Sequence, residues 1–137
     1  IGQYPEKLIP LSVKNLMRGK KIHLHNGGTP IRNWLHASDT ADAVIKVIES
    51  GQTNEIFNVA GGFEQENIET VRKVITAFYG TGENWQQYVD FDTDREGQDV
   101  RYALNDRKLK NLGWAPQKNF DEEIQSIIDH YKENFIW

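Results

Sequence analysis

Two arginines and one asparagine lie where a strand or a glycine-rich turn would hold them beside a ligand. Arg32 lies inside an expected strand, and Asn58 lies in an apolar segment that runs into Gly-Gly. Arg95 lies in the charged loop DTDREGQD, close to Gly97. An arginine grips phosphate oxygens as a fork, and glycine lets backbone amides come close to an anion. This pattern suggests a diphosphate site.

The same arginines are also compatible with a purely structural role. Because a guanidinium keeps its charge, a protein that buries one has to supply a carboxylate or bind an anionic ligand. Spacing alone favours carboxylates of the chain over a ligand. The candidates are Asp39 or Asp42 for Arg32, and Asp92 or Asp94 for Arg95.

Other kinds of catalytic or metal site find little support in the sequence. His23 and His25 alternate along an expected strand, a spacing that can ligate zinc, yet no third ligand lies at a recognisable distance. The chain has no cysteine and no Gly-x-Ser-x-Gly nucleophile motif. NGGTP and AGGFE do not have the spacing of a dinucleotide-binding glycine turn. We therefore expect no metal site.

Length and composition indicate one globular domain, residues 1–137. Hydrophobic residues make up 38% of the 137 residues and charged residues 26%, which is typical of a water-soluble protein. The net charge of −4 argues against a nucleic-acid partner, which would favour a basic surface. No apolar run approaches the ~20 residues that cross a bilayer, so we expect no membrane segment. The absence of cysteine suits a cytoplasmic protein.

The first residues suggest a longer parent protein. The chain begins at Ile1, without an initiator methionine, and continues directly into QYPEKLIPLSV. We therefore expect it to be the later part of a longer chain. A complete small protein that has been processed is the alternative.

Hydrophobic periodicity and turn residues predict alternating helices and strands, which indicates the α/β class. A helix with prolines near its start is expected at 5–19, followed by strands at 21–25 and 31–36. The nearly unbroken apolar segment 55–62 is expected to be a strand buried on both faces of a parallel sheet. Further helices are expected after the caps Ser38, Asn67 and Asn105, and a last one from Phe120 to Phe135.

The ends of two helices and the buried faces of three are also predicted. Glycine is a frequent helix stop, so Gly51 and Gly80 are expected to end the helices that begin at Ser38 and Asn67. Apolar residues at helical spacing indicate the face that packs on the core. For the first of these helices, that face consists of Ala41, Val44, Ile45 and Ile48, and for the second of Ile68, Val71, Ile75 and Phe78. For the last helix it consists of Phe120, Ile124, Ile127, Ile128, Tyr131 and Phe135.

Five segments occur in the same order, and at similar intervals, as in a known family. They are PEKLIP, IRNWLHASDTADAV, FNVAGG, DREGQDVRYAL and LGWAP. With them the chain resembles the nucleotide-sugar 4,6-dehydratases of the extended short-chain dehydrogenase/reductase family, and among these the dTDP-glucose branch, over essentially its whole length. The resemblance implies an α/β fold of helices with short strands. It would be the C-terminal substrate-binding region of an NAD(P)-binding, Rossmann-type enzyme, without the Rossmann core.

The resemblance assigns substrate-binding roles residue by residue. Lys7 and Leu8 match a lysine and a leucine that line the substrate pocket, and Asn58 matches a substrate-binding asparagine. Arg32 matches an arginine that contacts the nucleotide-sugar, which favours a ligand over the internal ion pairs. The strand His23, Leu24 and His25 matches a Pro-Ile-Tyr strand along the nucleotide, and the loop Asp94, Arg95, Glu96, Gly97 and Gln98 matches an Asp-Arg-Pro-Gly-His loop.

Three residues depart from the family pattern where the nucleotide is expected. His25 replaces a tyrosine, Glu96 a proline and Gln98 a histidine. An imidazole still stacks on a base and glutamine still forms hydrogen bonds, whereas Glu96 adds a negative charge near a diphosphate. The fold expectation is unaffected, but the base, in dTDP, CDP, GDP or UDP, stays open.

The resemblance implies that the parent is an NAD-dependent lyase that converts dTDP-glucose to dTDP-4-keto-6-deoxyglucose and water. The family's NAD site and catalytic residues lie upstream of PEKLIP, so we expect none of them in this chain. The alternatives are another epimerase, dehydratase or decarboxylase of the family, and a non-catalytic nucleotide-sugar-binding module. Without its Rossmann domain, the chain is expected to be inactive and to bind no NAD. It is also expected to self-associate through Val44, Ile45, Ile48 and the strand 55–62, or else to repack that strand and helix away from their family arrangement.

Overall fold

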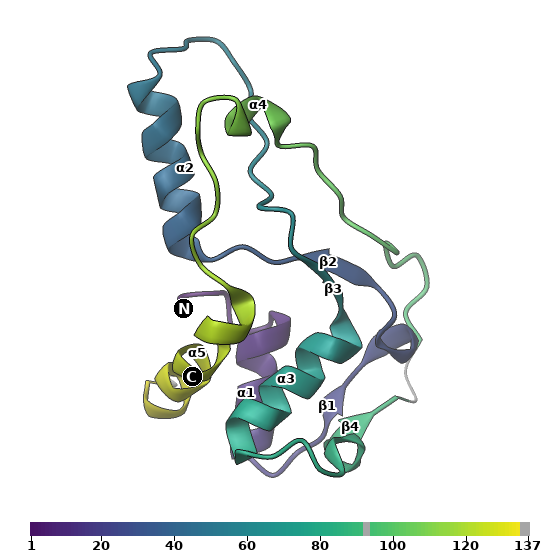
Figure 1. Ribbon diagram of the computed structural model, residues 1–137. Coiled ribbons are helices and arrows are strands. Elements are labelled where there is room, and N and C mark those ends of the chain that lie inside the picture. Colours follow the sequence, from purple (N-terminus) through teal and green to yellow (C-terminus); the bar gives the residue numbers. More distant parts are fainter. Residues whose placement is uncertain (92–93, 135–137) are drawn as a thin grey trace.

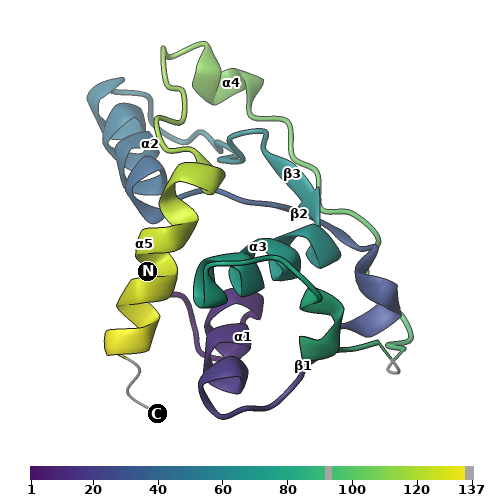
Figure 2. The same cartoon turned by 60° about the horizontal axis from the view of Figure 1, so that its bottom comes forward.

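A computed structural model describes residues 1–91 and 94–134 (Figure 1). Helices α1, α3 and α5 lie at one end of the molecule with strands β1 and β4, and α2 and α4 lie at the other end (Figures 1 and 2). Helices combined with short strands confirm the α/β class. The elements are α1 (Leu8–Met17), β1 (Ile22–His23), η1 (His25–Gly28), β2 (Ile31–Asn33), α2 (Ala37–Glu49), β3 (Glu64–Glu66), α3 (Asn67–Tyr79), η2 (Trp85–Tyr88), β4 (Val89–Asp90), α4 (Arg107–Lys110) and α5 (Phe120–Glu133).

The strands form two short pairs. β1 and β4 are parallel, with Ile22 opposite Val89, and β2 and β3 are antiparallel, with Arg32 opposite Gln65. Both predicted strands before α2 are shorter than expected. After β1 the chain turns into η1, because Asn26 adopts a left-handed conformation with φ of 52° that no strand can continue.

The main core lies between α1, α3 and α5. Each of these helices carries apolar residues three or four positions apart, so one face of each is buried. β1 and β4 close one side of this core, and its expected members in α3 and α5 are confirmed except Phe135, which lies outside the described residues. The buried residues are Ile9, Val13, Leu16, Ile22, Leu24, Val71, Val74, Ile75, Val89, Ile124, Ile128 and Tyr131.

A smaller core joins α2 to α4 and to the segment before α5. It consists of Ala43, Leu109 and Trp114. Beside it, the buried carboxylate of Asp39 accepts hydrogen bonds from the backbone N–H groups of Gln117, at 3.0 Å, and Lys118, at 3.1 Å. The indole of Trp114 donates to the Asp39 carbonyl oxygen. These bonds hold the start of α2 against the chain that leads into α5.

The caps of the helices differ from the predicted ones by one or two residues. His36, and not Ser38, precedes α2, and its Nδ1 accepts the hydrogen bond from the Ser38 N–H. Asn67 is the first residue of α3 and not its cap. Asn105 does accept a hydrogen bond from the Arg107 N–H at the start of α4. Gly80 ends α3 in a left-handed conformation, as predicted.

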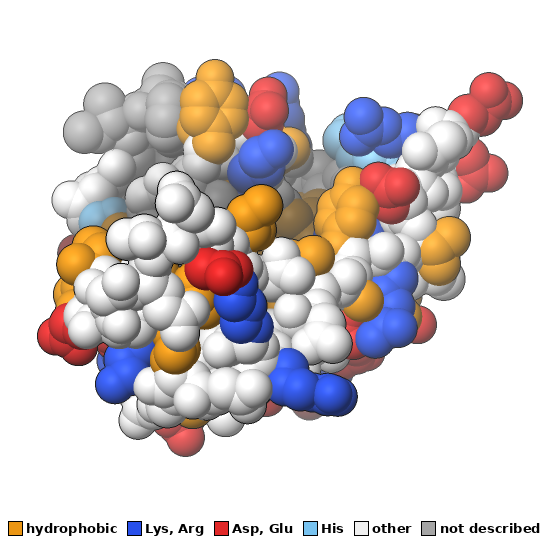
Figure 3. All heavy atoms as spheres, turned by 90° about the horizontal axis from the view of Figure 1, so that it is seen from above, with side chains coloured by type: hydrophobic (Ala, Val, Ile, Leu, Met, Phe, Trp, Pro, Cys, Tyr) orange, Lys and Arg blue, Asp and Glu red, His pale blue; other side chains and the backbone are white. Residues whose placement is uncertain are grey.

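Two predictions about buried segments are wrong. Segment 55–62 forms no strand, and Ile56 is 86% exposed, because the described residues contain no strand that pairs with it. α2 packs on the smaller core through Asp39, Ala43 and Val47, a row four residues apart. The predicted row on its other side is therefore exposed, and Figure 3 shows apolar side chains reaching the surface among charged ones. The exposed members of that row are Ala41, Val44, Ile45 and Ile48.

Candidate functional site

Arg32, in the middle of β2, contacts the loop that follows β4. Its Nη1 donates to the carbonyl oxygens of Ile31, at 2.8 Å, and Asp99, at 3.1 Å. Nε and Nη2 of Arg32 make no hydrogen bond or ion pair with any residue that the structure describes. These two nitrogens form the edge that binds a carboxylate or phosphate as a fork, and no described residue occupies that edge.

Tyr102 supports the same guanidinium from its ring face. The central carbon of the Arg32 guanidinium lies 4.3 Å from the centre of the Tyr102 ring, a cation–π contact. The Tyr102 hydroxyl donates to Oδ2 of Asp99 at 2.5 Å. That hydrogen bond and the negative charge of Asp99 raise the pKa of Tyr102, against the opposite effect of the positive charges of Arg32 and Arg95. The positive charges of both arginines therefore oppose the rise in the pKa of Tyr102.

Asn26 of η1 holds the backbone at Arg95. Its Oδ1 accepts from the Arg95 N–H at 2.6 Å, and its Nδ2 donates to the Arg95 carbonyl oxygen at 3.2 Å. The Arg95 side chain forms no ion pair with any described residue, Asp94 included. The alternative partner Asp92 lies outside the described residues. The structure thus brings β2, η1 and the loop 94–102 together around two arginines.

Sequence reasoning did not single out Asn26, Asp99 or Tyr102 for this site. The Asn-Gly-Gly turn carried a signal, since asparagine is one of the few residues that adopt a left-handed conformation readily. Asp99 and Tyr102 lie inside the quoted segment DREGQDVRYAL. Their contact with Arg32 depends on how that loop folds across β2, which no local pattern indicates.

The alternative prediction that Arg32 forms an ion pair with Asp39 or Asp42 is wrong. The Asp39 side chain is buried, and both of its carboxylate oxygens accept backbone N–H groups ahead of α5. Asp42 is exposed and forms no ion pair with Arg32. Among the described residues, no carboxylate therefore neutralises the open edge of Arg32.

A hollow of about 270 Å³ between α1 and β1 brings three other predicted residues together. His23 also lies beside Asp90, with its Nδ1 3.2 Å from an Asp90 carboxylate oxygen. Leu24 is buried in the main core, so its side chain does not face this hollow. Ser12 Oγ and His25 Nδ1 are buried without a hydrogen-bond partner among the described residues. The hollow is lined by Leu8, Leu11, Ser12, Asn15, Ile22, His23 and His25.

The remaining predicted residues are spread more widely. Lys7 precedes α1 and is exposed, 3.9 Å from the Glu6 carboxylate. Asn58 lies between α2 and β3 and donates to the Asn105 carbonyl oxygen, at the α4 end of the molecule. The loop residues Asp94, Glu96 and Gly97 are exposed and Gln98 is half-buried.

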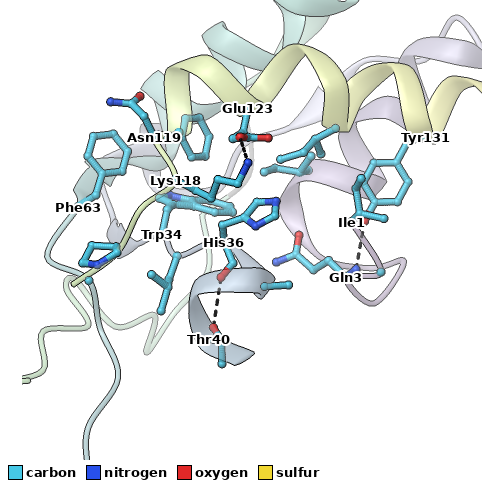
Figure 4. Close-up of a pocket in the computed structure, with 18 residues that line it drawn as sticks. Ile1, Gln3, Trp34, His36, Thr40, Phe63, Lys118, Asn119, Glu123 and Tyr131 are labelled. Carbon is cyan, nitrogen blue, oxygen red and sulfur yellow. Dashed lines mark hydrogen bonds and ion pairs between the residues drawn. The ribbon is translucent and has the colours of Figure 1, made fainter. Parts of the chain in front are cut away.

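A larger pocket of about 430 Å³ lies between α5, the start of α2 and the first residues of the chain, and none of the predicted residues lines it (Figure 4). Its apolar wall is formed by aliphatic side chains and by the aromatic residues Trp34, Phe63, Phe120 and Tyr131. At its rim Lys118 donates to Glu123 at 2.7 Å, which raises the pKa of Lys118 and lowers that of Glu123. Its apolar wall and paired charges do not make it an anion site.

The described residues offer neither a metal site nor a membrane span. They contain no group of three or more histidine, aspartate or glutamate side chains arranged to hold a metal ion. None of their helices has the length and apolar character that a membrane span requires.

The chain is similar in sequence and in fold to known nucleotide-sugar 4,6-dehydratases. The model of the family described as GDP-mannose 4,6 dehydratase matches residues 1–127. The dTDP-glucose 4,6-dehydratase of Escherichia coli is 37% identical over 142 aligned positions, which cover 98% of this chain and 39% of that protein. The chain thus spans about 40% of the length of the curated relatives that it matches.

Solved structures of two dehydratases follow the same fold. The dTDP-glucose 4,6-dehydratase of Bacillus anthracis in complex with NAD is 38% identical, with a TM-score of 0.84 over 96% of this chain and 41% of that chain. DesIV, the dTDP-glucose 4,6-dehydratase of Streptomyces venezuelae with NAD and TYD bound, is 34% identical, with a TM-score of 0.86 over 96% and 40%. The chain therefore belongs to the GDP-mannose 4,6-dehydratase family of extended short-chain dehydrogenases/reductases.

Proposed function

We propose that this chain is the nucleotide-sugar-binding portion of an NAD-dependent dTDP-glucose 4,6-dehydratase, the enzyme that forms dTDP-4-keto-6-deoxyglucose and water. One observation carries the proposal. Nε and Nη2 of Arg32 have no described partner, the loop that carries Arg95 is held by Asn26 of η1 and by Arg32 itself, and no described carboxylate pairs with either arginine. Two guanidiniums without a carboxylate partner among the described residues favour a ligand with two negative centres, such as a diphosphate.

The hollow between α1 and β1 is the proposed place for the nucleoside. β1 lines the hollow, and η1, which follows it, carries Asn26, whose side chain binds the Arg95 backbone. The hollow and the loop that carries Arg95 are therefore linked through η1. The unpartnered Ser12 Oγ and His25 Nδ1 offer hydrogen bonds to a base, and His25 offers a ring that stacks on one. Glu96 is exposed and makes no ion pair with a described residue.

The chemical steps are proposed to occur elsewhere in the parent enzyme. The residues present do not fit NAD, because no glycine turn of the dinucleotide-binding kind follows a strand in this sequence. We assign no step of the reaction to this chain. Its residues bind the nucleotide and orient the sugar, and the isolated chain is proposed to be inactive and to associate with a second copy of itself.

Titration calorimetry of the 137-residue chain with dTDP tests the proposal. Each arginine supplies charge-assisted contacts, so Arg32→Ala and Arg95→Ala should each weaken binding by about ten- to a hundred-fold. Arg72→Ala is the matched control, because Arg72 pairs with Glu69 on the surface of α3. Unchanged dTDP affinity in both site variants, or no binding by the unmodified chain, would contradict the proposed site. Titrations with UDP, CDP and GDP would rank the bases.

Two alternatives remain distinct from this proposal. Another nucleotide-sugar dehydratase, epimerase or decarboxylase of the same family would bind a different nucleotide more tightly than dTDP. A non-catalytic nucleotide-sugar-binding module would bind without any catalytic region. The coding DNA upstream of Ile1 separates the last case: an in-frame glycine-rich fingerprint and Tyr-x-x-x-Lys motif favour the enzyme, and a nearby start codon favours the module.

A further inference from the structure

We propose that Tyr102 is a positioning residue for Arg32, and that its ring holds the guanidinium with the open edge toward the diphosphate. The inference rests on the proposed function, because it assigns Tyr102 a part in binding the same ligand. Tyr102 itself need not touch that ligand. It acts through Arg32, whose guanidinium carbon lies 4.3 Å from the ring centre.

Two independent attachments fix the Tyr102 ring relative to β2. On one side the Tyr102 hydroxyl is tied to Oδ2 of Asp99, whose own carbonyl oxygen accepts from Arg32. On the other side the neighbouring residue Arg101 forms a β-bridge with Ile31 and an ion pair with Glu64 of β3. The ring is therefore held from its hydroxyl and from its backbone, although Tyr102 is 52% exposed.

The contacts of Tyr102 and Asp99 restrict the motion of the Arg32 side chain before a ligand binds. An arginine has four rotatable side-chain bonds, and immobilising it on binding costs conformational entropy that lowers the affinity. Hydrogen bonds from Nη1 to Ile31 and Asp99 fix one end of the guanidinium, and the ring of Tyr102 fixes its plane. The fork is thereby oriented before the ligand arrives, so removal of the ring should weaken diphosphate binding without removing any ligand contact.

The test is dTDP titration of the 137-residue chain with three variants. Tyr102→Leu removes the ring and should weaken binding by about 3- to 30-fold. Tyr102→Phe keeps the ring and its backbone attachment but loses the bond to Asp99, so it should weaken binding less than Tyr102→Leu does, by about two- to threefold, which a role of the hydroxyl alone would not allow. In an Arg32→Ala background, Tyr102→Leu should have no further effect, because there is no guanidinium left to position.

Tyr4→Leu is the control for loss of an exposed tyrosine, since Tyr4 is 66% exposed and lies outside this site. Thermal melts followed by circular dichroism establish that the variants are folded. If the unmodified chain binds dTDP and Tyr102→Leu binds equally well, the inference is overturned and the proposed function stands. If Tyr102→Leu weakens binding as much with Arg32→Ala as without it, Tyr102 does not act through Arg32. Failure of the unmodified chain to bind dTDP contradicts the proposed function itself.

Discussion

Asp106 is the buried carboxylate that ties α4 to the glycine-rich segment before β3. Its Oδ1 lies 2.8 Å from Lys110 Nζ, and its Oδ2 accepts from the Gly61 N–H at 3.1 Å. Burial by itself would raise the pKa of Asp106, but the hydrogen bonds from Lys110 and Gly61 lower it by more. The folded protein therefore holds this carboxyl ionised to a lower pH than the unfolded chain does.

This shift predicts a loss of stability in acid. Because the folded pKa is depressed, the stabilisation from Asp106 is fully present above about pH 4 and is lost as the pH falls through the folded pKa. Asp106→Asn cannot ionise, so its unfolding free energy should be about 1 kcal/mol lower at pH 7 and should fall less between about pH 5 and pH 2. Urea unfolding at a series of pH values measures both.

The exposed Asp42, which forms no ion pair among the described residues, supplies the control Asp42→Asn. That variant should follow the unmodified protein at every pH. Parallel curves for the unmodified protein and Asp106→Asn would show that Asp106 does not contribute to the acid sensitivity.

The sequence identified some site residues and missed others for a physical reason. Arg32 and Arg95 stand out because a charge inside a strand, or beside a glycine, needs an explanation at its own position. Tyr102 matters through a contact with a strand about seventy residues earlier, and an exposed tyrosine in a loop carries no local mark of that contact. A residue such as Tyr102, whose role depends on a distant contact, is identified only once the structure shows the loop packed on β2.

At the scale of elements, η1 depends on two adjacent glycines with different surroundings. Gly27 and Gly28 both have positive φ, at +62° and +76°. A Cβ on Gly27 would meet no atom within 4 Å, whereas one on Gly28 would lie 2.8 Å from the Ile68 Cβ and overlap the Leu24 side chain. Gly28 is thus where η1 packs closely on the main core and on α3.

We expect alanine substitutions at Gly27 and Gly28 to lower the free energy of unfolding by different amounts. Gly27→Ala should cost about 1 to 2 kcal/mol, because only the left-handed conformation is unfavourable for alanine. Gly28→Ala carries the same strain and adds overpacking against Leu24 and Ile68, a further cost of about 1 to 3 kcal/mol. Denaturant unfolding of the two variants side by side measures the difference. Equal destabilisation would mean that η1 moves away from the core at little cost.

The elements predicted correctly are those whose pattern is satisfied within the chain. α3 and α5 bury one apolar face each against α1, so helical periodicity alone located them. Val44, Ile45, Ile48 and Ile56 are as apolar as core residues, yet the structure leaves them exposed, whereas Phe57 and Val59 pack against the smaller core. Apolar character does not tell whether a side chain is covered by its own chain or by a partner, and no described element buries these four.

At the scale of the whole molecule, the exposed face of α2 is the feature that most affects behaviour in solution. Val44 and Ile45 are each 52% exposed, Ile48 is 72% exposed, and Ile56 on the neighbouring segment is 86% exposed. Apolar side chains grouped on one helix favour association, because each isoleucine that is covered gains about 1.5 to 3 kcal/mol. We expect the isolated chain to cover this face with a second copy of itself.

Sedimentation velocity over a range of chain concentrations tests this expectation. The unmodified chain should form a concentration-dependent dimer, and the double variant Ile45→Glu with Ile48→Glu should raise the dimer dissociation constant by about a hundredfold or more, because two buried isoleucines are lost and charges are placed in the interface. Met17→Glu is the control, since Met17 is 47% exposed at the end of α1, on another helix. A chain that stays monomeric at every concentration, or a dimer that the double variant leaves intact, would show that α2 is not the surface through which the copies meet.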